Sequence, residues 1–126
     1  MTFLSVFIGG GLGSLARYAL GLIFPYREGF PTATFFANLA AAFVLGLTIG
    51  WIAKMDAGSS NQIKWFLATG FCGGFSTFST FSLETLQLVK QQQWTMVCIY
   101  VSMSVVLSVL LLALGYFIVG PSFSKL

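Results

Sequence analysis

Three phenylalanines recur at every third position in one apolar segment of the chain: Phe75, Phe78 and Phe81. Residues three apart on a helix share a face, so we expect the three rings to form a stripe. Hydroxyl groups are interleaved with the rings, on Ser79, Thr80 and Ser82. The edge of a phenyl ring carries partial positive charge and can contact a small anion without a full charge that would trap it. The pattern is typical either of simple helix packing or of a surface that contacts an anion.

A pair of glycines, Gly73 and Gly74, precedes this stripe near the middle of the same segment. Glycine costs a helix about 1 kcal/mol relative to alanine, and Ser and Thr compete for backbone hydrogen bonds. We therefore expect the helix to break at the glycine pair. A break within a membrane is tolerated only beside protein or a watery cavity, and broken helices at mid-depth commonly form ion or substrate sites. The alternative is a helix that is kinked but closed.

The composition places these residues in a membrane protein. Of 126 residues, 57% are hydrophobic and 7% charged, and the mean hydropathy is +0.92, whereas a soluble domain carries about a quarter charged residues. The net charge of +3 is too small to indicate nucleic-acid binding. An enzyme is not expected, because the chain has no histidine and no constellation of acid, base and nucleophile.

Four apolar runs predict an all-α domain of four transmembrane helices covering residues 1–126. The runs lie at 2–24, 31–53, 65–89 and 94–120, and a polar loop is expected from Lys54 to Lys64. Tryptophans lie at predicted span ends, where indole rings prefer the interface: Trp51, Trp65 and Trp94. Small residues at helical spacing predict close helix packing: Gly9 with Gly13, and Ala42 with Gly46 and Gly50.

The costly polar groups of the spans fall at one depth. We call the membrane side on which the chain starts side A, and the other side B. Four groups lie near side B: Arg17, Asn38, Glu84 and Tyr100. Buried charges in membranes face the bundle or a watery cavity. Arg17 and Glu84 are therefore expected either to form a structural ion pair or to line an aqueous vestibule leading to Asn38. Ser104 and Ser108 lie deeper on the fourth span, one turn apart.

The third segment resembles the signature of a known family. Residues 70–84 read GFCGGFSTFSTFSLE and resemble the GGxxTFSTFSxE signature of the Fluc (CrcB-type) fluoride channels. Residues 34–39, TFFANL, resemble the asparagine motif of that family's second helix, and residues 9–18 resemble its glycine-rich first helix ending in arginine. The similarity covers essentially the whole chain.

This resemblance implies a passive, fluoride-selective channel of the plasma membrane that exports cytoplasmic fluoride and lowers its toxicity. It also implies an antiparallel, dual-topology homodimer in the lipid bilayer, with two pores. The pore positions would be Asn38, Phe78, Phe81, Ser79, Thr80, Tyr100, Ser104 and Ser108. The vestibule and polar track would be formed by Arg17, Thr34 and Glu84.

The resemblance further implies a structural sodium ion at the dimer centre, held by the backbone carbonyls of Gly73 and Ser76. Ser76 stands where the family usually has threonine, which should matter little because the carbonyl is the ligand. Leu107 stands where many members have glycine, and it could alter the helix crossing near Ser108.

The residues argue against two other classes of small membrane protein. A proton-coupled exporter of the small multidrug resistance type shares the size and the four spans, but it needs a carboxylate in the first span, where this chain has only Arg17. A purely structural membrane subunit would need neither a broken helix nor ordered hydroxyls.

The balance of basic residues predicts dual topology. Three lysines belong to side A: Lys54, Lys64 and Lys125. Side B has Lys90 and Arg27, joined by Arg17 if its side chain reaches the interface. Because the Lys/Arg bias of short loops sets orientation, this near balance predicts insertion both ways.

Overall fold

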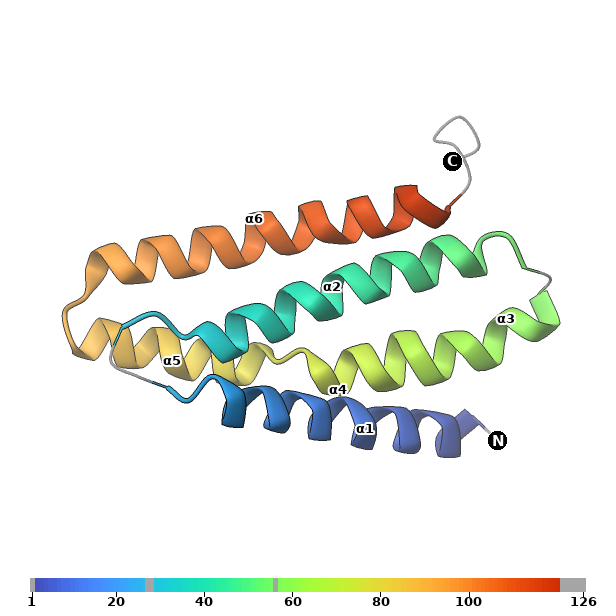
Figure 1. Cartoon of the computed structure of the whole chain (residues 1–126), viewed down its shortest axis with the longest axis horizontal. Coiled ribbons are helices and arrows are strands. Elements are labelled where there is room, and N and C mark those ends of the chain that lie inside the picture. The colour runs from blue at the N-terminus through green and yellow to red at the C-terminus, as the bar shows by residue number, and fades with distance from the viewer. Residues whose placement is uncertain (1, 27–28, 56, 121–126) are drawn as a thin grey trace.

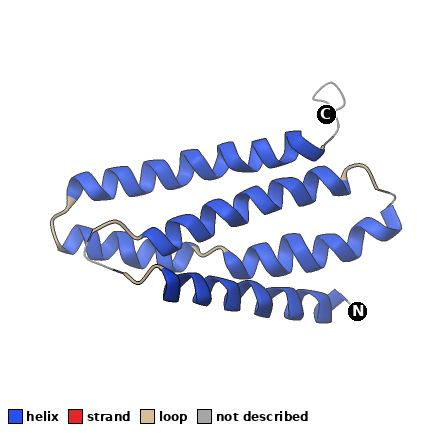
Figure 2. Cartoon of the chain, in the orientation of Figure 1, coloured by secondary structure: helices blue, strands red, loops and turns tan. Residues whose placement is uncertain are grey.

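The computed structural model describes residues 2–26, 29–55 and 57–120. Within these ranges the chain is helical and contains no strand (Figures 1 and 2). In chain order the elements are α1 (Thr2–Ile23), α2 (Thr32–Ile52), α3 (Ala57–Ile63), the π-helix η1 (Lys64–Cys72), α4 (Gly73–Phe75), α5 (Phe78–Lys90) and α6 (Trp94–Val119).

Three of the described helices are long and apolar enough to cross a membrane: α1, α2 and α6. Their bounds agree closely with three of the expected spans. The third expected span, 65–89, is not one helix, because it is divided among η1, α4 and α5. Figure 1 shows these pieces following one another beside α1 and α2.

The expected polar loop from Lys54 to Lys64 is largely wrong. The structure forms α3 at Ala57–Ile63 and joins it directly to η1. Asn61 and Gln62 are exposed, so their polar side chains are compatible with a helix that extends beyond the apolar span.

Close packing through glycine is confirmed on α1. A Cβ on Gly9 would collide with the carbonyl of Phe66, and one on Gly13 with the carbonyl of Phe71. Both carbonyls belong to η1, so the glycines let two helix backbones touch.

Glycines also allow close backbone contact between α2 and α6. A Cβ on Gly46 would collide with the carbonyl of Leu112, and one on Gly50 would lie 2.8 Å from the carbonyl of Tyr116. Gly115 on α6 lies reciprocally against the backbone of α2. The predicted stripe of small residues on α2 therefore faces α6.

The third segment is broken, but not at the glycine pair. Gly73 and Gly74 are helical, and the break falls at Ser76 and Thr77, whose φ/ψ angles of −75°/157° and −152°/115° are extended. Gly74 serves helix packing, because a Cβ there would collide with the carbonyl of Gly10 in α1. The break therefore lies where polar side chains can form hydrogen bonds with the backbone in place of the helical ones.

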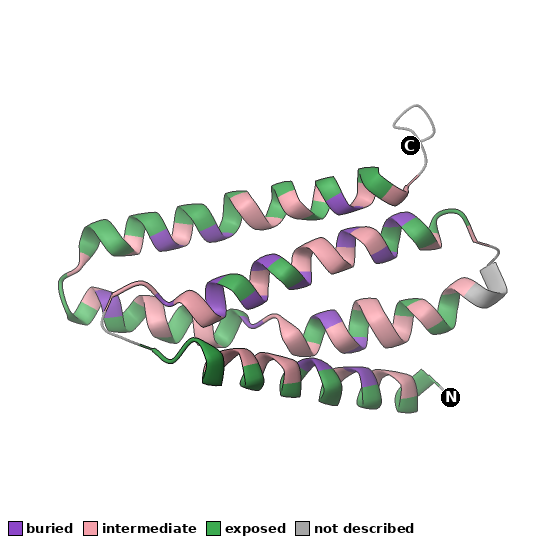
Figure 3. Cartoon of the chain, in the orientation of Figure 1, coloured by how far each residue is buried: buried purple, intermediate pink, exposed green. Residues whose placement is uncertain are grey.

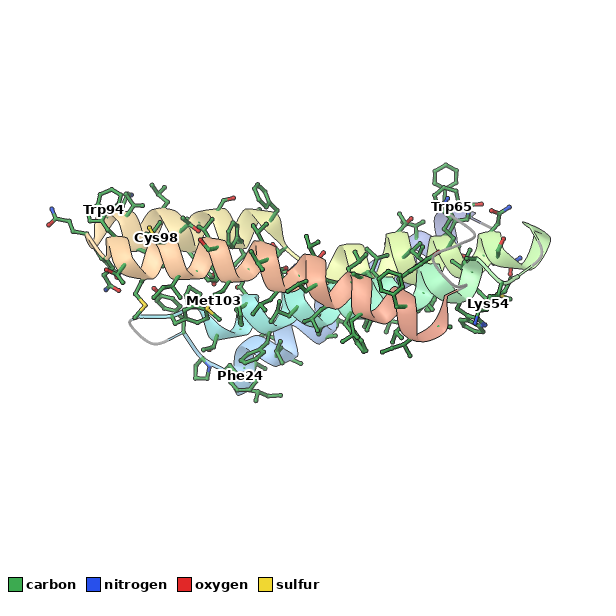
Figure 4. The ribbon with its side chains drawn as sticks, turned by 90° about the horizontal axis from the view of Figure 1, so that it is seen from above. Phe24, Lys54, Trp65, Trp94, Cys98 and Met103 are labelled. Carbon is green, nitrogen blue, oxygen red and sulfur yellow. The ribbon has the colours of Figure 1, made fainter. Side chains whose placement is uncertain are left out.

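Buried residues concentrate on α2 and on the inner faces of the other helices, whereas α1 and α6 expose large apolar side chains outward (Figure 3). Trp94 lies at one end of the bundle, and Trp65 and Lys54 lie at the other (Figure 4). Indole rings at both ends are typical of a helical bundle that extends from one membrane interface to the other.

Candidate ion-conduction site

Asn38 on α2 binds the broken backbone directly. Its Oδ1 accepts a hydrogen bond of 2.7 Å from the Thr77 N–H, and its Nδ2 donates to the Thr77 carbonyl at 3.3 Å. One side chain thus satisfies both backbone groups of an extended residue inside the bundle. A buried peptide left without partners would cost about 1–3 kcal/mol per group.

The Thr77 side chain starts the next helix. Its Oγ1 accepts from the Thr80 N–H at 3.2 Å, which is the bond expected of an N-cap residue, and it donates to Thr80 Oγ1 at 3.0 Å. Ser79 Oγ lies 3.3 Å from the same oxygen. The hydroxyls of Ser79 and Thr80 therefore gather around the cap of α5.

The break frees several backbone carbonyls, among them those of Gly73 and Ser76. In an uninterrupted helix the carbonyl of Gly73 would accept from Thr77 N–H, but that donor is bound to Asn38. The carbonyl of Ser76 would accept from Thr80 N–H, but that donor is bound to Thr77 Oγ1. Carbonyl oxygens of this kind are the ligands that hard cations take, so Gly73 and Ser76 fit the predicted sodium site.

Glu84 is held between two other helices. Its Oε1 accepts from the hydroxyl of Thr34 on α2, and its Oε2 accepts from the hydroxyl of Tyr100 on α6, each at 2.7 Å. Tyr100 is completely buried. The structure thus brings three of the predicted polar residues together at one point.

Arg17 is not paired with Glu84. Its Nε donates to the carbonyl of Gly74 at 3.3 Å, and Ser14 Oγ lies 3.5 Å from the same oxygen. Gly74 stands at the carboxyl end of a helix that stops one residue later, where carbonyls lack intrahelical donors and the helix dipole is negative. Of the two alternatives left open for Arg17 and Glu84, the direct ion pair is not formed, and Arg17 instead caps the helix end from α1.

The predicted stripe of three rings is divided by the break. Phe75 lies before it and pairs with Phe71 at a centroid distance of 5.6 Å. Phe78 and Phe81 follow it, 5.7 Å apart, and Phe81 lies 5.0 Å from the ring of Tyr100. The extended residues reset the helical register, so only the last two rings stay together.

A cavity of about 440 Å³ adjoins these two rings. Its wall includes four of the predicted pore residues besides Phe81, namely Asn38, Phe78, Ser104 and Ser108, together with both predicted cation ligands, Gly73 and Ser76. The remaining wall is mostly apolar and comes from α2, η1 and α6, with Thr77 at the break. Thr34, Glu84, Tyr100, Arg17, Ser79 and Thr80 are not part of this wall.

Ser104 has a buried hydroxyl without a hydrogen-bond partner among the described residues. Its side chain is only 6% exposed. A buried hydroxyl without a partner is costly unless something polar occupies the space beside it. The cavity is therefore suited to a water molecule or a small anion that accepts this hydrogen bond.

Thr77 is the site residue that the sequence reasoning missed. It lines the cavity, caps α5 and supplies the peptide that Asn38 binds. The available signal was its position: a threonine directly before an apolar helical run is a typical N-cap.

Apolar helices packed through glycines around an interrupted helix define a small multi-pass helical membrane protein. The chain belongs to the CrcB family, since residues 4–116 match the family described as "CrcB-like protein, Camphor Resistance (CrcB)". The protein named "Fluoride-specific ion channel FluC" from Pyrococcus abyssi is 41% identical over 115 residues, covering 91% of this chain and 93% of its own length. Proteins of the same name from Flavobacterium psychrophilum and Escherichia coli are 40% and 41% identical, covering 86% and 79% of this chain and 89% and 80% of their own lengths.

Proposed function

We propose that this chain is a passive fluoride channel of the plasma membrane, which releases fluoride from the cytoplasm and is not an enzyme. The observation that carries the proposal is the likeness, over about nine-tenths of the chain, to relatives named fluoride-specific ion channels. The cavity beside Phe78 and Phe81, with the unpaired hydroxyl of Ser104, supports it.

Fluoride is small and strongly hydrated, so a pathway must replace its water with closely placed donors. Ser104 offers a hydroxyl proton, and the edges of Phe78 and Phe81 offer partial positive charge. The Asn38 amide has two N–H groups, of which one is engaged by the Thr77 carbonyl, so the second is available on the cavity wall. A larger halide would meet the same donors at poorer distances.

The channel would be an antiparallel homodimer with two pores and four spans in each chain, the third span being the composite of η1, α4 and α5. Two exposed groups beside the break support a partner at this face. Phe78 is 79% exposed, and a Cβ on Gly73 would have no atom within 4 Å. A two-fold axis in the membrane plane would bring the breaks of both copies together at mid-depth.

Fluoride efflux from liposomes containing the purified protein tests the function. We expect efflux driven by the fluoride gradient alone, with little chloride efflux under the same conditions. A membrane potential supplies about 2.3 kcal/mol per charge per 100 mV, which suffices to expel an anion from a negative interior. Efflux that occurred only with a proton gradient or ATP would contradict the channel proposal.

The cation proposal rests on the carbonyls of Gly73 and Ser76. One chain offers too few oxygens for a hard cation, but two copies around a two-fold axis would double them. Replacing sodium by N-methyl-D-glucamine, which is too large for such a site, is expected to lower both the thermal stability of the dimer and its fluoride flux. Unchanged melting and flux after exhaustive sodium removal would exclude a structural ion.

A further inference from the structure

Phe30, in the loop between α1 and α2, is fixed by its neighbours in the chain. Gly29 has a φ of +124°, a conformation that suits glycine, and Pro31 is fully buried directly before α2. A residue before proline is restricted to extended conformations. The backbone of Phe30 therefore lies between a glycine with positive φ and a buried proline, which restricts its conformation.

The Phe30 ring packs by its edge against two buried rings. It lies 5.4 Å from Tyr100 at an interplanar angle of 82°, and 5.0 Å from Phe35 at 76°. Such T-shaped pairs are the favoured geometry of aromatic rings. The Tyr100 ring also contacts Phe81 on α5, at 5.0 Å, so it packs against both a loop residue and a residue beside the cavity.

We propose that Phe30 is a positioning residue for fluoride conduction, acting by holding the Tyr100 ring so that its hydroxyl reaches Glu84. The Tyr100 hydroxyl donates to Glu84 Oε2 at 2.7 Å, and this bond fixes one of the two carboxylate oxygens. Without the Phe30 ring, Tyr100 loses an edge-to-face neighbour, and its hydroxyl is held less firmly toward Glu84. The predicted change in fluoride flux rests on the proposed channel function. The hydrogen bond between Tyr100 and Glu84 does not, because it is a feature of the fold.

A double-mutant cycle tests the route through Tyr100. Phe30→Ala is expected to lower fluoride flux about three- to tenfold, the range that matches the strength of an aromatic pair. In a Tyr100→Phe background, which already lacks the hydroxyl, Phe30→Ala should cost little more. Phe24→Ala is the matched control, because Phe24 is an exposed ring paired with Phe36, 5.9 Å away, and should keep wild-type flux. Fully additive losses in the cycle would overturn the proposal.

A readout independent of transport separates this inference from the proposed function. The infrared C–O band of ring-labelled tyrosine reports hydroxyl hydrogen bonding, and Tyr100→Phe identifies the Tyr100 component. We expect Phe30→Ala to shift that component, and Phe30→Trp, which keeps an aromatic ring without adding a tyrosine, to leave it closer to its wild-type position; Phe24→Ala should leave it unchanged. An unshifted band in Phe30→Ala would overturn the inference even if the protein conducts fluoride. A shifted band without any fluoride flux in the wild type would refute the channel while leaving the Phe30–Tyr100 contact established.

Discussion

Replacing Asn38 with aspartate is expected to lower fluoride flux about 100-fold or more. The new carboxylate would lie on the cavity wall, where an anion about 6 Å away at an effective dielectric constant of about 20 is destabilised by about 3 kcal/mol. It would also lack the N–H that Asn38 donates to the Thr77 carbonyl, leaving two oxygens facing each other. Fluoride efflux from liposomes measures the loss, and size-exclusion chromatography shows whether the protein still assembles.

Asn61→Asp is the matched control, because it makes the same chemical change on an exposed residue of α3. That variant should keep wild-type flux. If Asn38→Asp also conducted at the wild-type rate, the assignment of Asn38 to the pathway would not stand.

Asn38 also connects the anion pathway to the proposed cation site. By taking the Thr77 N–H, it removes the donor that would otherwise occupy the Gly73 carbonyl. The same side chain lines the cavity. A single asparagine would therefore both keep a proposed cation ligand available and place an amide on the proposed anion pathway.

Several features of the site could be predicted from the sequence because they depend on local spacing or on depth in a membrane. Phe78 and Phe81 share a face because they are three residues apart within one helix. Only the family resemblance predicts that Thr34 belongs to the polar track, whereas residue counts along the spans place Glu84 and Tyr100 at one depth. The structure brings all three into contact.

Other features depend on tertiary contacts that spacing does not reveal. The break falls at Ser76 and Thr77 rather than at the glycine pair, because Gly74 is needed against Gly10 and because Asn38 is available to bind Thr77. Arg17 binds the Gly74 carbonyl instead of Glu84, since the break leaves that carbonyl without its helical donor. The π-helix η1 likewise follows no pattern visible in the sequence.

We expect the chain to insert into the membrane in both orientations, because its basic residues are nearly balanced between the two sides. Three basic residues belong to side A and two to side B, and Arg17 does not add to side B, because its Nε is held by the Gly74 carbonyl beside the break. Lys54 and Trp65 lie at one end of the bundle and Trp94 at the other, as the threading requires (Figure 4). Of the residues counted, Arg27 and Lys125 lie outside the described ranges. A bias of one charge is weak, so a C-terminal tag should be accessible from both sides of the membrane.

Shifting the basic residues should force a single orientation. One variant would combine Lys54→Gln, Lys64→Gln and Gln91→Lys, and its counterpart would combine Lys90→Gln with Asn61→Lys and Gln62→Lys; all these positions are exposed. Each variant alone should label from one side only and lose more than about nine-tenths of cellular fluoride export, because an antiparallel pair needs both orientations. Coexpression should restore export, since each variant supplies the orientation that the other lacks. Strictly one-sided labelling of the unaltered chain, or full export by either variant alone, would instead establish a parallel assembly.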